Sequence, residues 1–149
     1  MESLFSAGNA EAIISRLNRL QASTQPQWGK MTVSQMMAHA QEPLKVATGK
    51  LKLKQSLIGV LFGKMAKKQL LKPEPFKKNL PTAPEFKVKN QPVFDTEKQH
   101  LIDLINDYVK NGPEGITSDA HPFFGKMTIE EWDALQWKHL DHHLRQFGV

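Results

Sequence analysis

The stretch TIEEWDALQWKHLDHHLRQF, residues 128–147, predicts the last helix of the chain and decides the fold. Its large apolar side chains recur at helical spacing and fall on one face. At about 100° per residue, His139 and His143 lie within this apolar face, on either side of Trp132. Buried imidazole without a partner is costly, and a shared metal ion is the partner that uses both rings. The charged side chains are expected on the opposite, solvated face: Glu130, Glu131, Lys138, Asp141 and Arg145.

Length and composition restrict the classes of protein to which this chain can belong. A chain of 149 residues has the length of one domain with a full core, so we expect residues 1–149 to form a single domain. No apolar run reaches the roughly 18–20 residues that a membrane span needs, and the N-terminus lacks the features of a signal peptide. The absence of cysteine excludes disulfides, thiolate metal sites and cysteine nucleophiles. These features predict a cytoplasmic protein.

Positive charge is concentrated in one segment. The chain carries a formal net charge of +5, yet residues 50–89 alone contain 11 lysines and 2 glutamates. A basic surface attracts nucleic acid, anionic lipid or an anionic substrate. The segment fits no known nucleic-acid-binding motif, so we expect no nucleic-acid partner.

Two helix starts share one sequence. Gly-Lys-Met-Thr occurs at residues 29–32 and again at 125–128. In each case the threonine suits the N-cap, and Gln35 or Glu131 follows three residues later to complete a capping box. Helices are therefore predicted to begin at Thr32 and Thr128.

The remaining pattern predicts an all-α fold. One helix is expected from about Asn9 to Ala22, a second from Thr32 to Thr48, and a third from Asp95 or Thr96 to Gly112. Residues 50–93 form a lysine- and proline-rich crossover segment, with a helix expected within 51–71 and an extended surface arm after it. Two helices, a long crossover and two more helices are typical of a four-helix bundle.

A third histidine joins the pair. His39 lies at the edge of the apolar face of the second helix, and Pro43 deprives its carbonyl of the usual helical donor, so we expect a kink there. The H-x-x-x-H spacing is that of zinc proteases, but Leu140 stands where their glutamate base would be, which excludes that activity. Three neutral nitrogens would leave an open coordination position of the catalytic type.

The other histidines receive different predictions. His142 is expected to be solvated or to support the metal ligands from beside them. His121, in the loop before the last helix, either anchors that loop or reaches the site, and the sequence leaves both open. His100 is expected on the surface.

Several stretches resemble the DinB/YfiT-like superfamily, and within it a bacterial branch known only as a domain of unknown function. They are HPFFGKMT at 121–128, EW at 131–132, KHLDHHLRQFG at 138–148, KMT at 30–32, QMM with His39 at 35–39, and KKNLPTAP at 77–84. The resemblance implies a four-helix bundle with a divalent metal held by one histidine of the second helix and an H-x-x-x-H pair of the fourth. Those positions are His39, His139 and His143 here.

The resemblance also implies a chemistry. Studied members of the superfamily are S-transferases and isomerases that use low-molecular-weight thiols such as bacillithiol or mycothiol. One interpretation is therefore a divalent-metal-dependent enzyme, a thiol-dependent S-transferase or a hydrolase acting on a small molecule. The alternative is a metal-binding or stress-related bundle without enzymatic activity. Imidazole suits several divalent metals, so the residues do not select among zinc, nickel, iron and manganese.

The apolar segment at residues 53–71 leaves a further choice. Gly59 and Gly63 interrupt its apolar residues and allow close approach of backbones, so we expect it to pack on the bundle, with a homodimer contact as one outcome. The rival interpretation is a basic amphipathic membrane anchor, because Lys64, Lys67 and Lys68 follow directly.

Overall fold

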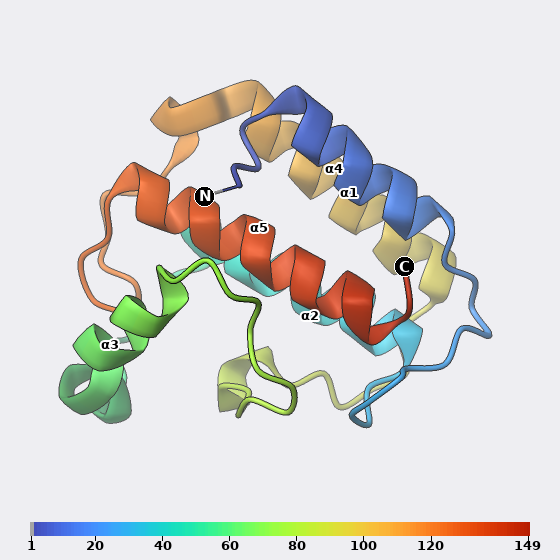
Figure 1. Ribbon diagram of the computed structural model, residues 1–149, viewed down its shortest axis with the longest axis horizontal. Coiled ribbons are helices and arrows are strands. Elements are labelled where there is room, and N and C mark those ends of the chain that lie inside the picture. The colour runs from blue at the N-terminus through green and yellow to red at the C-terminus, as the bar shows by residue number, and fades with distance from the viewer. Residues whose placement is uncertain (1) are drawn as a thin grey trace.

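The computed structural model describes residues 2–149, and its regular secondary structure is helical, which confirms the all-α prediction (Figure 1). Within this range the only extended pairing is a single bridge between His121 and Gly125. The helices, in chain order, are α1 (Ala7–Asn18), α2 (Val33–Ala47), α3 (Leu57–Leu70), the 3-10 helix η1 (Pro84–Phe86), α4 (Phe94–Asn111), the 3-10 helix η2 (Gly112–Gly115) and α5 (Ile129–Gln146).

Four helices build the core. α5 crosses the centre of the molecule and contacts α1 and α2, while α4 packs against α1 and α2 (Figure 1). Burying apolar surface stabilises this arrangement by about 25 cal/mol per Å². The largest fully buried side chains are Trp132, Tyr108, Leu4, Ile13, Leu17, Met36, Met37, Leu44, Leu70, Leu101, Ile105 and Leu144.

Both predicted capping boxes are present. Thr32 Oγ1 accepts from the backbone N–H of Gln35 at 3.2 Å, and Gln35 Oε1 accepts from the N–H of Thr32 at 3.1 Å. Thr128 and Glu131 make the same two bonds, at 3.2 and 2.9 Å. Four N–H groups at each helix start lack helical acceptors, so these side chains fix where α2 and α5 begin.

The other boundaries shift by a few residues. α1 begins two residues earlier than expected, after Ser6, and ends at Asn18. Beyond it, the N–H of Arg19 donates to the carbonyl of Arg16, and the N–H of Leu20 donates to the carbonyl of Leu17. α4 starts at Phe94, just before the predicted Asp95. α2 continues as a helix through Pro43, which is buried.

The prediction that the charged side chains of α5 lie on a solvated face is wrong in part. Lys138 and Asp141 are each only 5% exposed, because α5 is surrounded by other elements instead of lying at the surface. Asp141 pairs with Arg16 of α1 at 2.8 Å and with Arg145 at 2.7 Å. Lys138 Nζ donates to the carbonyls of Leu70 and Lys72. Buried polar groups are tolerated when they are hydrogen-bonded, and these charges meet that condition.

Outside the core, α3 lies at one end of the molecule (Figure 1). It contacts the rest of the chain through Gly59 and Gly63, through the buried Leu70, and through Lys67, whose Nζ lies 3.0 Å from a carboxylate oxygen of Glu131. A Cβ on Gly59 or Gly63 would lie 2.6 or 2.2 Å from the carbonyl oxygen of Phe123. The predicted close approach of backbones is therefore confirmed. The arm after α3 is mostly exposed, as expected, but Phe76 and Phe86 turn inward and pack against the core.

Candidate metal centre

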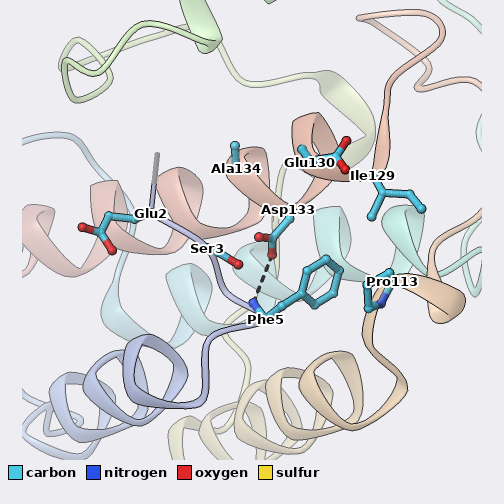
Figure 2. Close-up of a pocket in the computed structure, with 8 residues that line it drawn as sticks. All are labelled: Glu2, Ser3, Phe5, Pro113, Ile129, Glu130, Asp133 and Ala134. Carbon is cyan, nitrogen blue, oxygen red and sulfur yellow. Dashed lines mark hydrogen bonds between the residues drawn. The ribbon is translucent and has the colours of Figure 1, made fainter.

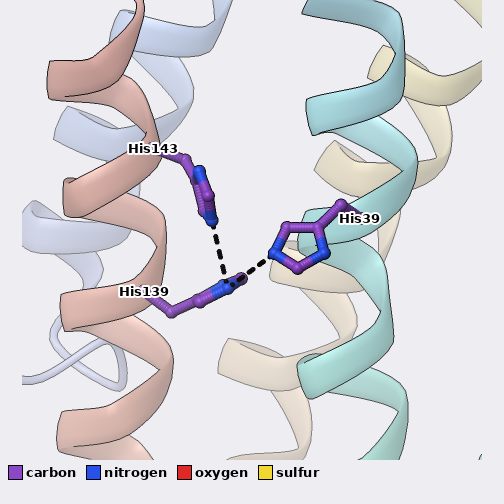
Figure 3. Close-up of side chains that lie close together, drawn as sticks. All are labelled: His39, His139 and His143. Carbon is purple, nitrogen blue, oxygen red and sulfur yellow. Dashed lines mark hydrogen bonds between the residues drawn. The ribbon is translucent and has the colours of Figure 1, made fainter. Parts of the chain in front are cut away.

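Three histidines converge between α2 and α5 (Figure 3). His39 comes from α2, whereas His139 and His143 stand one turn apart on α5. One ring nitrogen of each lies within 4.8 Å of the others. His139 Nε2 is 3.0 Å from His39 Nε2 and 3.2 Å from His143 Nε2. The predicted residues are thus brought together by the packing of two helices.

Hydrogen bonds on the far side of two rings fix their tautomers. His39 Nδ1 lies 2.9 Å from the carbonyl oxygen of Phe86, which only accepts, so Nδ1 carries the proton and donates. His143 Nδ1 lies 2.8 Å from Gln146 Oε1 and donates in the same way. The amide orientation of Gln146 is set because its Nε2 donates to the carbonyl of Trp28 at 2.8 Å. Both histidines therefore present an unprotonated Nε2 to the cluster.

The cluster then holds more lone pairs than protons. His139 Nε2 faces the Nε2 atoms of both His39 and His143, and a neutral imidazole brings at most one proton to that position. At least one of the two contacts is consequently made without a well-directed proton. A cation at the centre would satisfy all three nitrogens, and a divalent metal is the usual partner of such a donor set.

Burial keeps these rings neutral. Desolvation lowers the pKa of His39 and holds the pKa of His139 well below its ordinary value. For His143, desolvation and then the nearby His39 lower the pKa to about 3. An added proton is therefore a poor partner for the unpaired ring nitrogens, because burial disfavours the charged ring. Neutral imidazole is the form that coordinates metal.

His142 lies beside the cluster without being a member of it. Its ring is half-buried between Trp28 and Phe76, at 5.8 and 5.9 Å between centroids, and 5.2 Å from the ring of His143. Burial lowers its pKa as well. Phe76 belongs to the crossover segment, so this segment contributes a side chain that packs beside the histidines.

His121 anchors the loop before α5. Its Nδ1 accepts from the backbone N–H groups of Phe123 and Phe124 at 3.0 and 3.1 Å, and its ring lies 5.0 Å from that of Trp132. It is not part of the three-histidine group. Between the two roles that the sequence left open, the structure places His121 in the loop-anchoring one. His100 is exposed, as expected.

Two partners of the histidines were missed from the sequence. Gln146 follows His143 at a spacing of three on the same helix, which places the two side chains together, and this signal was available. The Phe86 carbonyl gave no signal, because it reaches His39 only through the folding of the crossover segment, 47 residues away in sequence.

A separate hollow of about 280 Å³ lies near the start of α5 (Figure 2). Its lining residues are Glu2, Ser3, Phe5, Pro113, Ile129, Glu130, Asp133 and Ala134. Asp133 accepts from the backbone N–H groups of Leu4 and Phe5, at 3.1 and 3.3 Å. The buried carboxylate thus holds the N-terminal segment against α5, which is a structural role.

Comparison with known proteins gives one match. Searches of curated proteins and of solved structures return nothing similar. A family model with the description "Protein of unknown function (DUF1569)" matches residues 3–148, nearly the whole chain. The chain therefore belongs to the DUF1569 family.

Proposed function

We propose that the protein binds one divalent metal ion through the Nε2 atoms of His39, His139 and His143. The observation that carries the proposal is the convergence of three nitrogens of neutral, buried imidazoles, two of them oriented by hydrogen bonds from Nδ1. Such bonds on the far ring nitrogen fix ligands in metal sites and raise their basicity. Imidazole suits zinc, nickel and iron, whereas manganese prefers oxygen ligands, so metal analysis decides among them.

We further propose that the bound metal serves an enzyme acting on a small molecule, as a thiol-dependent S-transferase or a hydrolase. Three neutral ligands leave the metal its full charge, and such a metal lowers the pKa of a bound water or thiol. The resemblance to the DinB/YfiT-like superfamily favours a low-molecular-weight thiol as co-substrate. Membership of that superfamily and its four-helix bundle architecture are part of this proposal.

The residues around the histidines support binding of an anionic co-substrate. Lys78 lies over the ring of Trp28, with Nζ 4.4 Å from its centroid, and Trp28 in turn contacts His142. Lys78 is thus connected to the histidines through Trp28 and His142, and its charge would favour the approach of small carboxylates and thiolates. The three-histidine group would hold the metal, while His142 and Phe76 would shape the space beside it.

A non-catalytic metal-binding or stress-related protein is the second candidate. The observation in its favour is that the group of potential ligands contains only histidine, with no carboxylate to act as general base. Asp141, the acidic neighbour on α5, is engaged by Arg16 and Arg145. The two candidates differ in whether an exogenous nucleophile reaches the metal.

Cobalt substitution separates them. We expect a thiol such as cysteine or glutathione, titrated into the cobalt-loaded protein, to produce a thiolate-to-metal charge-transfer band, and the metal-loaded protein to conjugate that thiol to a small electrophile. Cobalt bound with no spectral response to thiols, carboxylates or azide would mean a closed coordination shell and would favour the non-catalytic protein. Failure to retain any divalent metal would overturn the proposal as a whole.

A further inference from the structure

One helix carries most of the exposed apolar surface. Of the nine large hydrophobic side chains that are exposed in residues 2–149, six belong to α3. Leu57 is 84% exposed and Leu61 76% exposed. The other four are Ile58, Val60, Phe62 and Met65. Scattered exposed apolar residues are normal, but a cluster on one helix marks an interaction surface.

The orientation of this surface is fixed by the glycines of α3. Gly59 and Gly63 lie against the backbone of Phe123, and Leu70 is also buried on this side. At about 100° per residue, these three lie within an arc of about 40°. Leu57, Ile58, Leu61 and Met65 lie on the opposite side of the helix, and Val60 and Phe62 lie on its two flanks. The side with the two glycines and the buried Leu70 faces the protein, and the side that carries the exposed large side chains faces outward.

Positive charge borders the apolar residues. Lys64 and Lys68 are exposed and lie on the same outward side of α3, beside Leu57 and Leu61. Lys54 and Lys72 are exposed at the two ends of the helix. The sequence has no acidic residue between Lys50 and Pro73, so nothing within the segment neutralises these lysines.

The combination of exposed apolar side chains and exposed lysines decides whether a second copy of the chain or a lipid surface covers α3. A second copy of the chain would cover the apolar side chains but would bring two sets of lysines together, and like charges repel. An anionic lipid surface accepts the apolar side chains at the boundary between headgroups and acyl chains and pairs the lysines with phosphates. Fourteen residues of helix measure about 21 Å, which suits a helix lying in the plane of the surface. No helix in the described part of the chain is long and apolar enough to cross a membrane.

We propose that α3 docks the protein on an anionic lipid surface. Ile58, Leu61, Phe62 and Met65 enter the boundary region, and Lys64 and Lys68 contact the headgroups. This inference rests on α3 alone and does not depend on the metal site.

The test is flotation of the full-length protein with vesicles. One set is made of phosphatidylcholine alone and the other of phosphatidylcholine and phosphatidylglycerol in equal parts. We expect binding to the anionic vesicles that weakens as salt is raised. Replacing Lys64 and Lys68 together by Gln should lower the partition coefficient by about thirtyfold, at roughly 1 kcal/mol for each lysine. Replacing Ile58 and Leu61 together by Gln should lower it at least as much.

Matched variants provide the controls. Lys30→Gln with Lys110→Gln removes the same charge from exposed positions outside the crossover segment and should cost much less binding. Val93→Gln removes an exposed apolar side chain outside α3 and should leave binding unchanged. All replaced side chains are exposed, so thermal melts should match wild type.

Three results would overturn the proposal. The first is binding to neither set of vesicles. The second is equal binding to both sets, which would remove the role of the lysines. The third is self-association with micromolar affinity that is lost when Ile58 and Leu61 are replaced, which would assign the surface to a second copy.

Discussion

Gln146 Oε1 lies 2.8 Å from His143 Nδ1, one turn further along α5. The same amide donates from Nε2 to the carbonyl of Trp28, so Gln146 cannot turn its oxygen away without losing a second bond. This hydrogen bond selects the tautomer of His143 that carries its proton on Nδ1, so the unprotonated Nε2 faces His39 and His139. Gln146, which is not one of the proposed metal ligands, therefore determines that His143 presents an unprotonated Nε2 to the metal position.

The first prediction concerns metal content. His139→Ala and His143→Ala should each lose most of the divalent metal that wild type retains, because two nitrogens hold the ion far less tightly than three. Elemental analysis of protein purified without an affinity tag measures this. His100→Ala, at an exposed position, is the matched control and should keep the wild-type content. Wild-type metal content in both α5 variants would show that the histidines do not form the site.

Replacement of Gln146 should weaken metal binding without removing a ligand. Gln146→Leu frees His143 to rotate and to change tautomer, and loss of such a partner typically costs tenfold to about a hundredfold in affinity. Competition with a chelator of known affinity measures the change. Gln21→Leu, at an exposed position, serves as control. Equal affinities for wild type and Gln146→Leu would refute the positioning role.

The two capping boxes should contribute similarly to stability. Thr32→Ala and Thr128→Ala each remove the oxygen that accepts from the third N–H of a helix, at a cost of about 1 kcal/mol. Urea denaturation measures the loss. Thr96→Ala, exposed near the start of α4 and away from its N-cap, should change the free energy of unfolding much less. An unchanged midpoint for either cap variant would contradict the proposed energetic role of that cap.

Gly63 should be required for attachment of α3. A Cβ at this position would lie 2.2 Å from the carbonyl oxygen of Phe123, which is backbone and cannot move aside easily. In Gly63→Ala, hydrogen exchange within residues 57–70 should accelerate while the core helices stay protected. Gly8→Ala, in α1 with open space around it, should instead be neutral or stabilising by up to about 1 kcal/mol. Unchanged exchange in Gly63→Ala would mean that α3 is held by other contacts.

His121 should make stability depend on pH. Burial lowers its pKa from 6.5 to about 4, so between these values the unfolded chain binds a proton that the folded protein does not. Its contribution is fully present above pH 6.5 and is lost as the pH falls towards 4, a change of about 3 kcal/mol.

The variant His121→Asn isolates this effect from that of the other histidines. Asparagine keeps an acceptor near Nδ1 for the N–H groups of Phe123 and Phe124 but does not titrate. Urea melts at a series of pH values should show a shallower loss of stability in the variant than in wild type. Parallel curves would mean that His121 does not remain neutral in the folded protein.

Local chemistry made part of this protein predictable. The starts of α2 and α5 follow from threonines that cap N–H groups three residues away, and this interaction needs no tertiary contact. The shared direction of His139 and His143 follows from helical geometry alone. The inward position of His39 followed from its place near an apolar face, although its distance from the pair did not.

Tertiary packing decided the rest, because it depends on which elements surround a residue. Helical periodicity placed Asp141 and Lys138 on a solvated face, yet α1 and the end of α3 cover that face: Asp141 pairs with Arg16, and Lys138 donates to the carbonyls of Leu70 and Lys72. Helical periodicity also did not predict that most apolar side chains of α3 point outward. It shows which residues share a face of a helix, but not which other elements cover that face. Local sequence was enough to predict the core helices and the histidine pair of α5. The packing of α2 and of the crossover segment against α5 was needed to bring His39 to that pair and the carbonyl of Phe86 to His39, because these contacts join residues far apart in the chain.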